Sequence, residues 1–110
     1  VTPYLNFKGN CREALEFYAA TLGGKITAMM TFAEAPPSEQ LPAEIGNQVM
    51  HAQLDLGDAI LMASDGCEMY AKPQGLYLSL NPSDPAEAER IFNAFAEGGE
   101  VTMPLGQTFW

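Results

Sequence analysis

The side chains that could do chemistry in this chain occupy alternate positions of three segments with the pattern of β-strands. His51 is the only histidine, and histidine is the side chain best suited to give or take a proton near neutral pH. Asp55 lies two positions further along the same expected strand face, where a carboxylate could orient the imidazole. The other hydrogen-bonding side chains on these faces are Tyr4, Asn6, Gln53, Tyr77, Ser79 and Asn81. Together they predict a polar surface suited to binding a small molecule.

Two interpretations of this surface remain open. A sheet with one solvated face also alternates apolar and polar residues. Solvated strands favour Lys and Glu, however, and the polar positions of these segments carry neither, which favours a semi-buried cleft. His51 is either the acid–base group of that cleft or a hydrogen-bonded histidine without a catalytic task, since no nucleophile accompanies it.

Metal and nucleotide chemistry has little support in the sequence. A catalytic metal needs two or three His, Cys or carboxylate ligands that converge, and the chain has no HExxH, no HxxxH and no His–carboxylate facial triad. P-loop, GxGxxG and GxSxG motifs do not occur either. We therefore predict no cofactor and no metal-binding residues, with a divalent metal kept as a poorly supported alternative. The methionines at positions 29, 30, 50, 62 and 103 are expected to fill core and cavity wall rather than to bind a soft ligand.

The elements that must position these residues come in two similar copies, offset by 75 residues. Leu5-Asn6 corresponds to Leu80-Asn81, Phe17 to Phe92, and Gly23-Gly24 to Gly98-Gly99. Each copy has the order strand, polar turn, helix, Gly-Gly and strand. A repeat that cannot bury its own apolar face packs on its twin, so we expect two like modules around a shared concavity.

Periodicity gives the element boundaries. In the first copy, residues 2–7, 25–32, 49–56 and 59–64 are predicted strands, and Met50, Ala52, Leu54 and Leu56 share the apolar face of the third. A helix follows Asn10, with Asn10 and Glu13 as a capping box, and Gly23-Gly24 ends it.

In the second copy, residues 76–81 and 100–105 are predicted strands. The helix between them is capped by Asp84, with Pro85 at its first position and Glu87 at the capping-box position. Its expected buried face consists of Ala88, Ile91, Phe92 and Phe95. Residues 33–48 and 65–75 are expected loops. The repeat calls for two further strands, so we expect the second module to be incomplete.

Composition bounds the class of protein. A chain of 110 residues is one domain on length alone. Its formal charge of −9, from 14 acidic and 5 basic residues, argues against nucleic acid and anionic membranes as partners. Cys11 and Cys67 show no CxxC spacing and indicate free thiols in a cytoplasmic protein. Cys11 is either a small apolar residue in a helix–sheet seam or a thiol activated by a helix N-terminus. Unpaired sheet edges predict a homodimer.

Several sequence stretches resemble one known family. They are VTPYLNF at 1–7, GNCREA at 9–14, LGG at 22–24, VMHA at 49–52, LMASD at 61–65, MPL at 103–105 and TFW at 108–110. They are similar to PhnB-like bacterial proteins of the glyoxalase / bleomycin-resistance / extradiol dioxygenase superfamily, the vicinal oxygen chelate proteins. Members are often labelled 3-demethylubiquinone 3-methyltransferase-like, although nothing in the sequence suggests binding of a methyl donor.

The resemblance implies an α+β fold of paired βαβββ modules, with a mixed sheet curved round a cleft and the helices outside. Module one would span about 1–65 and module two about 76–110 of a single domain, 1–110. Metal-using relatives place ligands where this chain has Tyr4 or Asn6, Leu61 or Met62, and Tyr77. None of these is an ordinary ligand for a divalent metal, which argues against metal-dependent glyoxalase or dioxygenase chemistry.

Three functions follow as alternatives. The favoured one is an enzyme acting on a small metabolite, with His51 as acid–base group and with a substrate-binding set formed by Tyr4, Asn6, Gln53, Met62, Tyr77 and Ser79. The second is metal-free sequestration of an aromatic or amphipathic ligand, as in drug-sequestering relatives. The third is a structural or interaction role, with the cup filled by side chains. The expected partners are a small-molecule ligand and a second copy of the chain.

Overall fold

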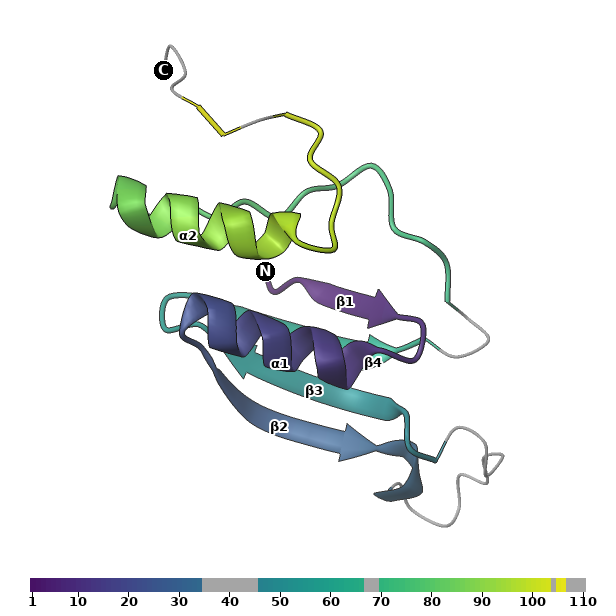
Figure 1. The fold of residues 1–110 in the computed structure, drawn as a ribbon. Coiled ribbons are helices and arrows are strands. Elements are labelled where there is room, and N and C mark those ends of the chain that lie inside the picture. The colour runs from purple at the N-terminus through teal and green to yellow at the C-terminus, as the bar shows by residue number, and fades with distance from the viewer. Residues whose placement is uncertain (35–45, 67–69, 104, 107–110) are drawn as a thin grey trace. The chain divides into compact units, whose positions relative to one another are not determined.

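The computed structural model describes residues 1–34, 46–66, 70–103 and 105–106 of the chain. These residues form two compact units, an N-terminal unit (1–75) and a C-terminal unit (76–110) (Figure 1). No helix in the described residues combines the length and the apolar character needed to cross a membrane.

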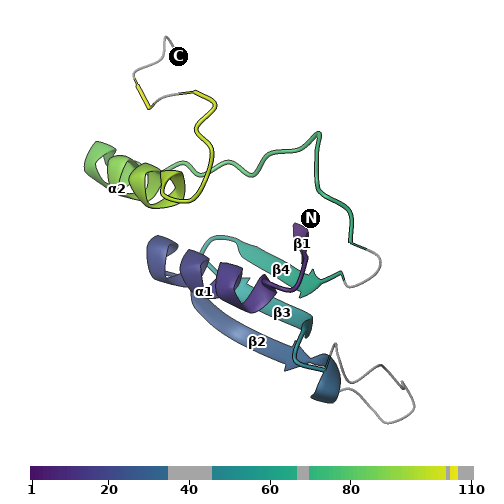
Figure 2. The same ribbon diagram turned by 45° about the vertical axis from the view of Figure 1, so that its right-hand side comes forward.

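The N-terminal unit is a mixed four-stranded sheet with a helix on one face. Its elements are β1 (Tyr4–Phe7), α1 (Cys11–Leu22), β2 (Lys25–Thr31), the 3₁₀ turn η1 (Phe32–Glu34), β3 (Val49–Asp55) and β4 (Ile60–Asp65). The strand order is β1-β4-β3-β2, with β1 parallel to β4 and the other neighbours antiparallel. Figures 1 and 2 show α1 lying across one side of this sheet. The α+β class and the βαβββ order predicted for the first module are confirmed for this unit.

The helix α1 covers a small apolar core. Cys11 and Leu15 of α1 have no exposed surface, and they pack against Val49, Ala52 and Leu54 of β3 and Ala63 of β4. The helix ends at Leu22 because Gly23 adopts a left-handed conformation with φ 75°, as its predicted role requires. The N–H of Gly24 then donates to the carbonyl oxygen of Ala19 at 3.0 Å.

The start of α1 differs from the prediction. The Asn10 side chain makes no capping hydrogen bond, so the capping box with Glu13 is wrong. Asp65, at the end of β4, takes this role instead: its Oδ1 accepts from the N–H of Cys11 at 3.0 Å. Its Oδ2 accepts from the N–H of Val49 at 2.8 Å. A buried carboxylate at a helix N-terminus satisfies orphan donors and is favoured by the helix dipole.

Two register shifts interrupt the alternation of buried and exposed side chains along β2 and β3. The pairing skips Thr27 on β2 and Met50 on β3. The sequence assigned Met50 to the apolar face, whereas the structure buries Val49 there and leaves Met50 half-buried. A β-bulge adds one residue to a strand, so the side chains before it change face relative to those after it.

The C-terminal unit contains α2 (Pro85–Ala96). Asp84 caps it as predicted, because its side chain accepts from the N–H of Ala86 at 3.1 Å and Pro85 occupies the first turn. Glu87 does not complete a capping box; its carboxylate accepts from Arg90 one turn later, at 3.1 Å to Nε. The four residues expected to form the apolar face of α2 are each half-buried, and none is fully buried: Ala88, Ile91, Phe92 and Phe95.

The predicted strands at 76–81 and 100–105 are wrong for the described residues, which form no strand there. Tyr77 is 97% exposed. The pairing in the N-terminal unit gives the physical reason. The strands on either side of α1 do not pair with each other: β1 pairs with β4, and β2 pairs with β3. Segments 76–81 and 100–105 lack counterparts of β3 and β4 among the described residues, and a strand backbone without a ladder partner is not stable.

Candidate functional site

The face of the N-terminal sheet opposite α1, called here the open face, carries the predicted polar residues. Leu5 and Phe7 pack toward the core, so Tyr4 and Asn6 between them point the other way. Tyr4 pairs with Met62, and Met62 pairs with Gln53. Directly paired residues share a face. The open face therefore brings together Tyr4, Asn6, Met30, His51, Gln53, Met62 and Ser64.

The centre of the open face is a contact between Tyr4 and His51. The Tyr4 hydroxyl lies 3.2 Å from Nδ1 of His51, with ring centroids 5.9 Å apart and planes inclined by 34°. The two residues are on β1 and β3, with β4 between them, so the tyrosine side chain crosses one strand to reach the imidazole. Since the phenol occupies Nδ1, Nε2 is the ring nitrogen left for a ligand, as donor in one tautomer and as acceptor in the other.

A second polar contact lies on the same face. The Ser64 hydroxyl donates to Oδ1 of Asn6 at 3.1 Å, from β4 to β1. Asn6 is exposed, and with its oxygen engaged its amide N–H groups are the part that can donate to a ligand. Sequence reasoning missed Ser64 because residues 59–64 are too apolar for their sidedness to be assigned. Its position two residues after Met62 was the available signal.

Asp55 does not orient His51, contrary to the prediction. Its Oδ1 accepts from the N–H of Gly57 at 2.8 Å, in the turn after β3. Residues four apart on a strand are separated by about 13 Å at roughly 3.3 Å per residue, so a short carboxylate cannot span the gap. A turn amide two residues away is the nearer donor, and Tyr4 is the group that holds the imidazole.

Tyr77, Ser79 and Asn81 belong to the C-terminal unit. All three are exposed on irregular backbone. Tyr77 and Ser79 stay predicted members of the site, and Asn81 stays a predicted polar residue of the same segment.

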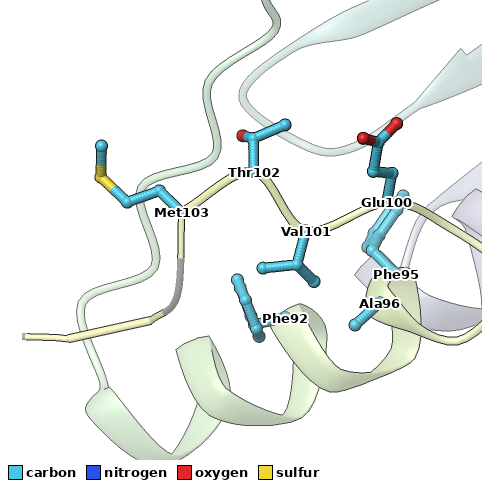
Figure 3. Close-up of a pocket in the computed structure, with 7 residues that line it drawn as sticks. All are labelled: Phe92, Phe95, Ala96, Glu100, Val101, Thr102 and Met103. Carbon is cyan, nitrogen blue, oxygen red and sulfur yellow. The ribbon is translucent and has the colours of Figure 1, made fainter.

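A cavity of about 180 Å³ lies within the C-terminal unit (Figure 3). It is lined by Phe92, Phe95, Ala96, Glu100, Val101, Thr102 and Met103. Figure 3 shows Val101 pointing toward α2, while Glu100 and Thr102 point away from it. An apolar helix face beside a single chain segment leaves such a hollow, and Glu100 is the one ionisable residue among those that line it. The candidate site is therefore the open face rather than this cavity.

The donors on the open face do not fit a divalent metal. Of the places that metal-using relatives employ, Tyr4 offers a phenol engaged by His51, Asn6 an amide oxygen engaged by Ser64, and Met62 a thioether. Divalent metals of catalytic sites prefer imidazole and carboxylate. Within the described residues no group of three or more His, Cys, Asp or Glu side chains is placed to hold a metal ion.

Cys11 is the apolar filler of the two alternatives, not an activated thiol. It is fully buried. Burial, with a smaller contribution from the Asp65 carboxylate, raises the pKa of the Cys11 thiol to about 12, against the opposing effect of Arg12. Because the Cys11 thiol is both buried and held protonated, it is neither an activated nucleophile nor accessible to a metal ion. Cys67 lies outside the described residues.

Comparison with known proteins places the chain among named relatives. The family model described as 3-demethylubiquinone-9 3-methyltransferase matches residues 1–110. Protein YjdN of Escherichia coli (strain K12) is 33% identical over 119 residues, which cover 100% of this chain and 81% of that protein.

Two solved structures are similar in fold. Protein PA1353 from Pseudomonas aeruginosa has a TM-score of 0.89 and 49% identity, over 100% of this chain and 81% of that one. A PhnB protein from Bacillus cereus, described with the same methyltransferase name, has a TM-score of 0.72 and 23% identity, over 96% of this chain and 80% of that one. At that identity the second likeness concerns the fold alone.

Proposed function

This chain belongs to the PhnB-like family described as 3-demethylubiquinone-9 3-methyltransferase, and from this premise we propose that it binds a small metabolite on the open face and acts on it. His51 is the proton-transfer group, and the substrate is placed by Tyr4, Asn6, Gln53 and Met62, with Tyr77 and Ser79 from the C-terminal unit. The protein works in the cytoplasm as a homodimer, in which a second copy covers the sheet edges at β1 and β2.

The observation that carries this proposal is the hydrogen bond between Tyr4 and Nδ1 of His51. A proton-transfer imidazole works best when its second nitrogen is held, because the ring then presents one defined atom to the substrate. Nε2 exchanges the proton, while the Asn6 amide, fixed by Ser64, donates to an oxygen of the ligand. The methyltransferase name of the family supplies no step of this proposal, because nothing in the sequence suggests binding of a methyl donor.

The alternative is metal-free sequestration without turnover. Its specific support is the aromatic and apolar surface exposed on the open face, where Tyr4 is 49% and Met30 43% exposed. Stacking and burial against such groups hold an amphipathic ligand without any chemistry. The two functions share one surface and differ in whether the bound molecule changes.

The single histidine makes the test direct, because the imidazole C–H signals in an NMR spectrum belong to His51 alone. Catechol and bleomycin, chosen from the chemistry named in the superfamily, serve as probes. We expect at least one probe to shift the His51 signals saturably, with weaker binding in Tyr4→Phe and unchanged binding in Glu16→Gln, an exposed position of α1. Conversion of the probe during the titration supports the enzyme, and saturation without conversion supports sequestration.

Binding that leaves the His51 signals in place and survives His51→Ala would refute a site on the open face. If none of the probes shifts His51, the structural or interaction role is favoured instead. A loss of probe binding in Tyr77→Phe would support the assignment of Tyr77, a residue of the C-terminal unit, to the substrate-binding set.

A further inference from the structure

The open face gathers methionine sulfur around His51, an arrangement that goes beyond the substrate-placing role proposed for Met62. Met30 of β2 is the direct cross-strand partner of His51. Met62 of β4 is the direct partner of Gln53, so it lies one diagonal step from His51 on the other side of β3. The sequence alone assigned these methionines to core and cavity wall. In the structure Met29 packs against the core, whereas Met30 is 43% exposed and Met62 half-buried.

The register places the three side chains within mutual reach. Direct cross-strand partners have Cβ atoms about 4.5–5.5 Å apart, and diagonal neighbours are separated by about 7–8 Å, which long side chains bridge. Methionine has three rotatable bonds beyond its Cα, so either sulfur can swing over β3 toward the imidazole. Because Met30 and Met62 lie on opposite sides of β3, His51 stands between two thioethers rather than beside a pair on one flank.

The imidazole is already oriented for ligation. Tyr4 holds Nδ1 at 3.2 Å, so Nε2 is the ring nitrogen left for a ligand. A histidine that binds a metal through one nitrogen usually has its other nitrogen hydrogen-bonded, which fixes the ring. On the open face, the Tyr4 hydroxyl is the hydrogen-bond partner that fixes the His51 ring.

The ligand types select the cation. Two thioethers and one imidazole form a soft, uncharged set, which prefers Cu(I) to the hard divalent ions that bind carboxylates. The net charge of −9 raises the local concentration of cations around the chain. We propose that Met30, His51 and Met62 form a binding site for Cu(I).

A copper competition experiment on the full chain tests this site. Cys67→Ser is the starting protein, because a thiol would bind Cu(I) by itself, and Cys11 is buried and protonated. Without oxygen, this protein is expected to withdraw one equivalent of Cu(I) from its coloured bicinchoninate complex. Met30→Leu, Met62→Leu and His51→Gln should each lower the affinity at least about tenfold, and Tyr4→Phe about 10–100-fold as a supporting partner.

The matched control is Met103→Leu, which removes a methionine that is 75% exposed and lies in the C-terminal unit. Leucine has nearly the volume of methionine, so these variants keep the packing of the parent. Equal copper affinity in Met103→Leu and parent supports the site. An equal loss in Met103→Leu and Met30→Leu overturns it, as does full withdrawal of copper by the variant lacking all three ligands, or no withdrawal by the parent.

A second readout needs no substitution at the ligands. With methionine methyl groups labelled with ¹³C, Ag(I) stands in for Cu(I) as a diamagnetic probe. The Met30 and Met62 methyl signals should shift together with the His51 ring signals, at one equivalent, while the Met103 methyl stays in place. Shifts spread evenly over all methionines would overturn the proposal. Met30→Leu also separates this proposal from the small-molecule function, because it removes a proposed copper ligand and leaves Tyr4 and Nε2 of His51 intact.

Discussion

Removal of the Asp65 carboxylate tests whether one side chain ties together the start of α1, the start of β3 and the end of β4. Asp65 is 4% exposed and accepts from the N–H groups of Cys11 at 3.0 Å and Val49 at 2.8 Å. A hydrogen bond to a charged group contributes about 1.5–3 kcal/mol net, so loss of both bonds in Asp65→Ala should cost about 3–6 kcal/mol. That is a large part of the roughly 5–15 kcal/mol by which a domain is stable.

Asn10→Ala is the matched control at the same helix end. Sequence reasoning makes Asn10 the cap, and loss of a cap typically costs ~1 kcal/mol. In the structure the Asn10 side chain makes no capping bond, and its backbone carbonyl still accepts from the N–H of Ala14 at 3.0 Å. The expected cost of Asn10→Ala is therefore within about 0.5 kcal/mol of zero, as at an ordinary surface position.

Urea unfolding followed by far-UV circular dichroism at pH 7 measures both variants, with the slope of the transition as the check on comparable unfolding. In thermal melts a loss of 3 kcal/mol corresponds to roughly 12–24 °C for a unit of this size. Asp65→Asn should fall between the parent and Asp65→Ala, since one carbonyl oxygen remains while an amide N–H group faces a backbone donor. Equal costs for Asp65→Ala and Asn10→Ala would refute the reasoning, and so would a cost below about 1 kcal/mol for Asp65→Ala.

Three further substitutions test the core and the end of α1. The Cys11 thiol has its pKa raised from 9.0 to about 12 in the folded chain, so it stays protonated there while it ionises on unfolding. The stability it contributes is complete below pH 9 and falls by about 1.4 kcal/mol per pH unit from pH 9 toward 12. Cys11→Ala should flatten this decline in urea titrations between pH 9 and 10.5, and an unchanged slope would contradict the assignment. At Gly24 an added Cβ would lie 2.7 Å from Cδ2 of Leu56 and 2.9 Å from the Asp55 carbonyl oxygen. Gly24→Ala should therefore cost about 1–3 kcal/mol through overpacking. Gly23→Ala meets no atom within 4 Å but keeps φ at +75°, so its cost of about 1–2 kcal/mol is conformational. Thermal melts compare the two, and a near-zero cost at either glycine would contradict the corresponding argument.

Local sequence patterns predicted most of the elements. The strands β1 to β4 and both helices lie within a few residues of their predicted limits. Gly23 ends α1 and Asp84 begins α2, because a left-handed glycine and a capping carboxylate act on the residues next to them. The open face was predictable in the same way, since alternation along a strand decides which side chains share a side.

The partners on that face were not predictable. Tyr4 rather than Asp55 holds His51, and Ser64 rather than a ligand engages Oδ1 of Asn6. Both contacts depend on β4 lying beside β1, which brings together residues 47 and 58 positions apart in the chain. The bulges at Thr27 and Met50 likewise follow from the pairing of β2 with β3, and they decided which neighbouring side chains are buried.

The amino-acid sequence by itself determined where elements begin and end and which residues share a face, because backbone geometry repeats over two or 3.6 residues whatever lies nearby. Tertiary structure alone decided which of the predicted strand segments pair into a sheet. Segment 76–81 has the alternation of β1 and forms no strand among the described residues, because an extended segment becomes a strand only when a neighbour takes up its N–H and C=O groups. The cap of α1 also depends on tertiary structure. Asp65 accepts from the N–H of Cys11, 54 residues away in sequence, because the sheet places the end of β4 beside the start of the helix.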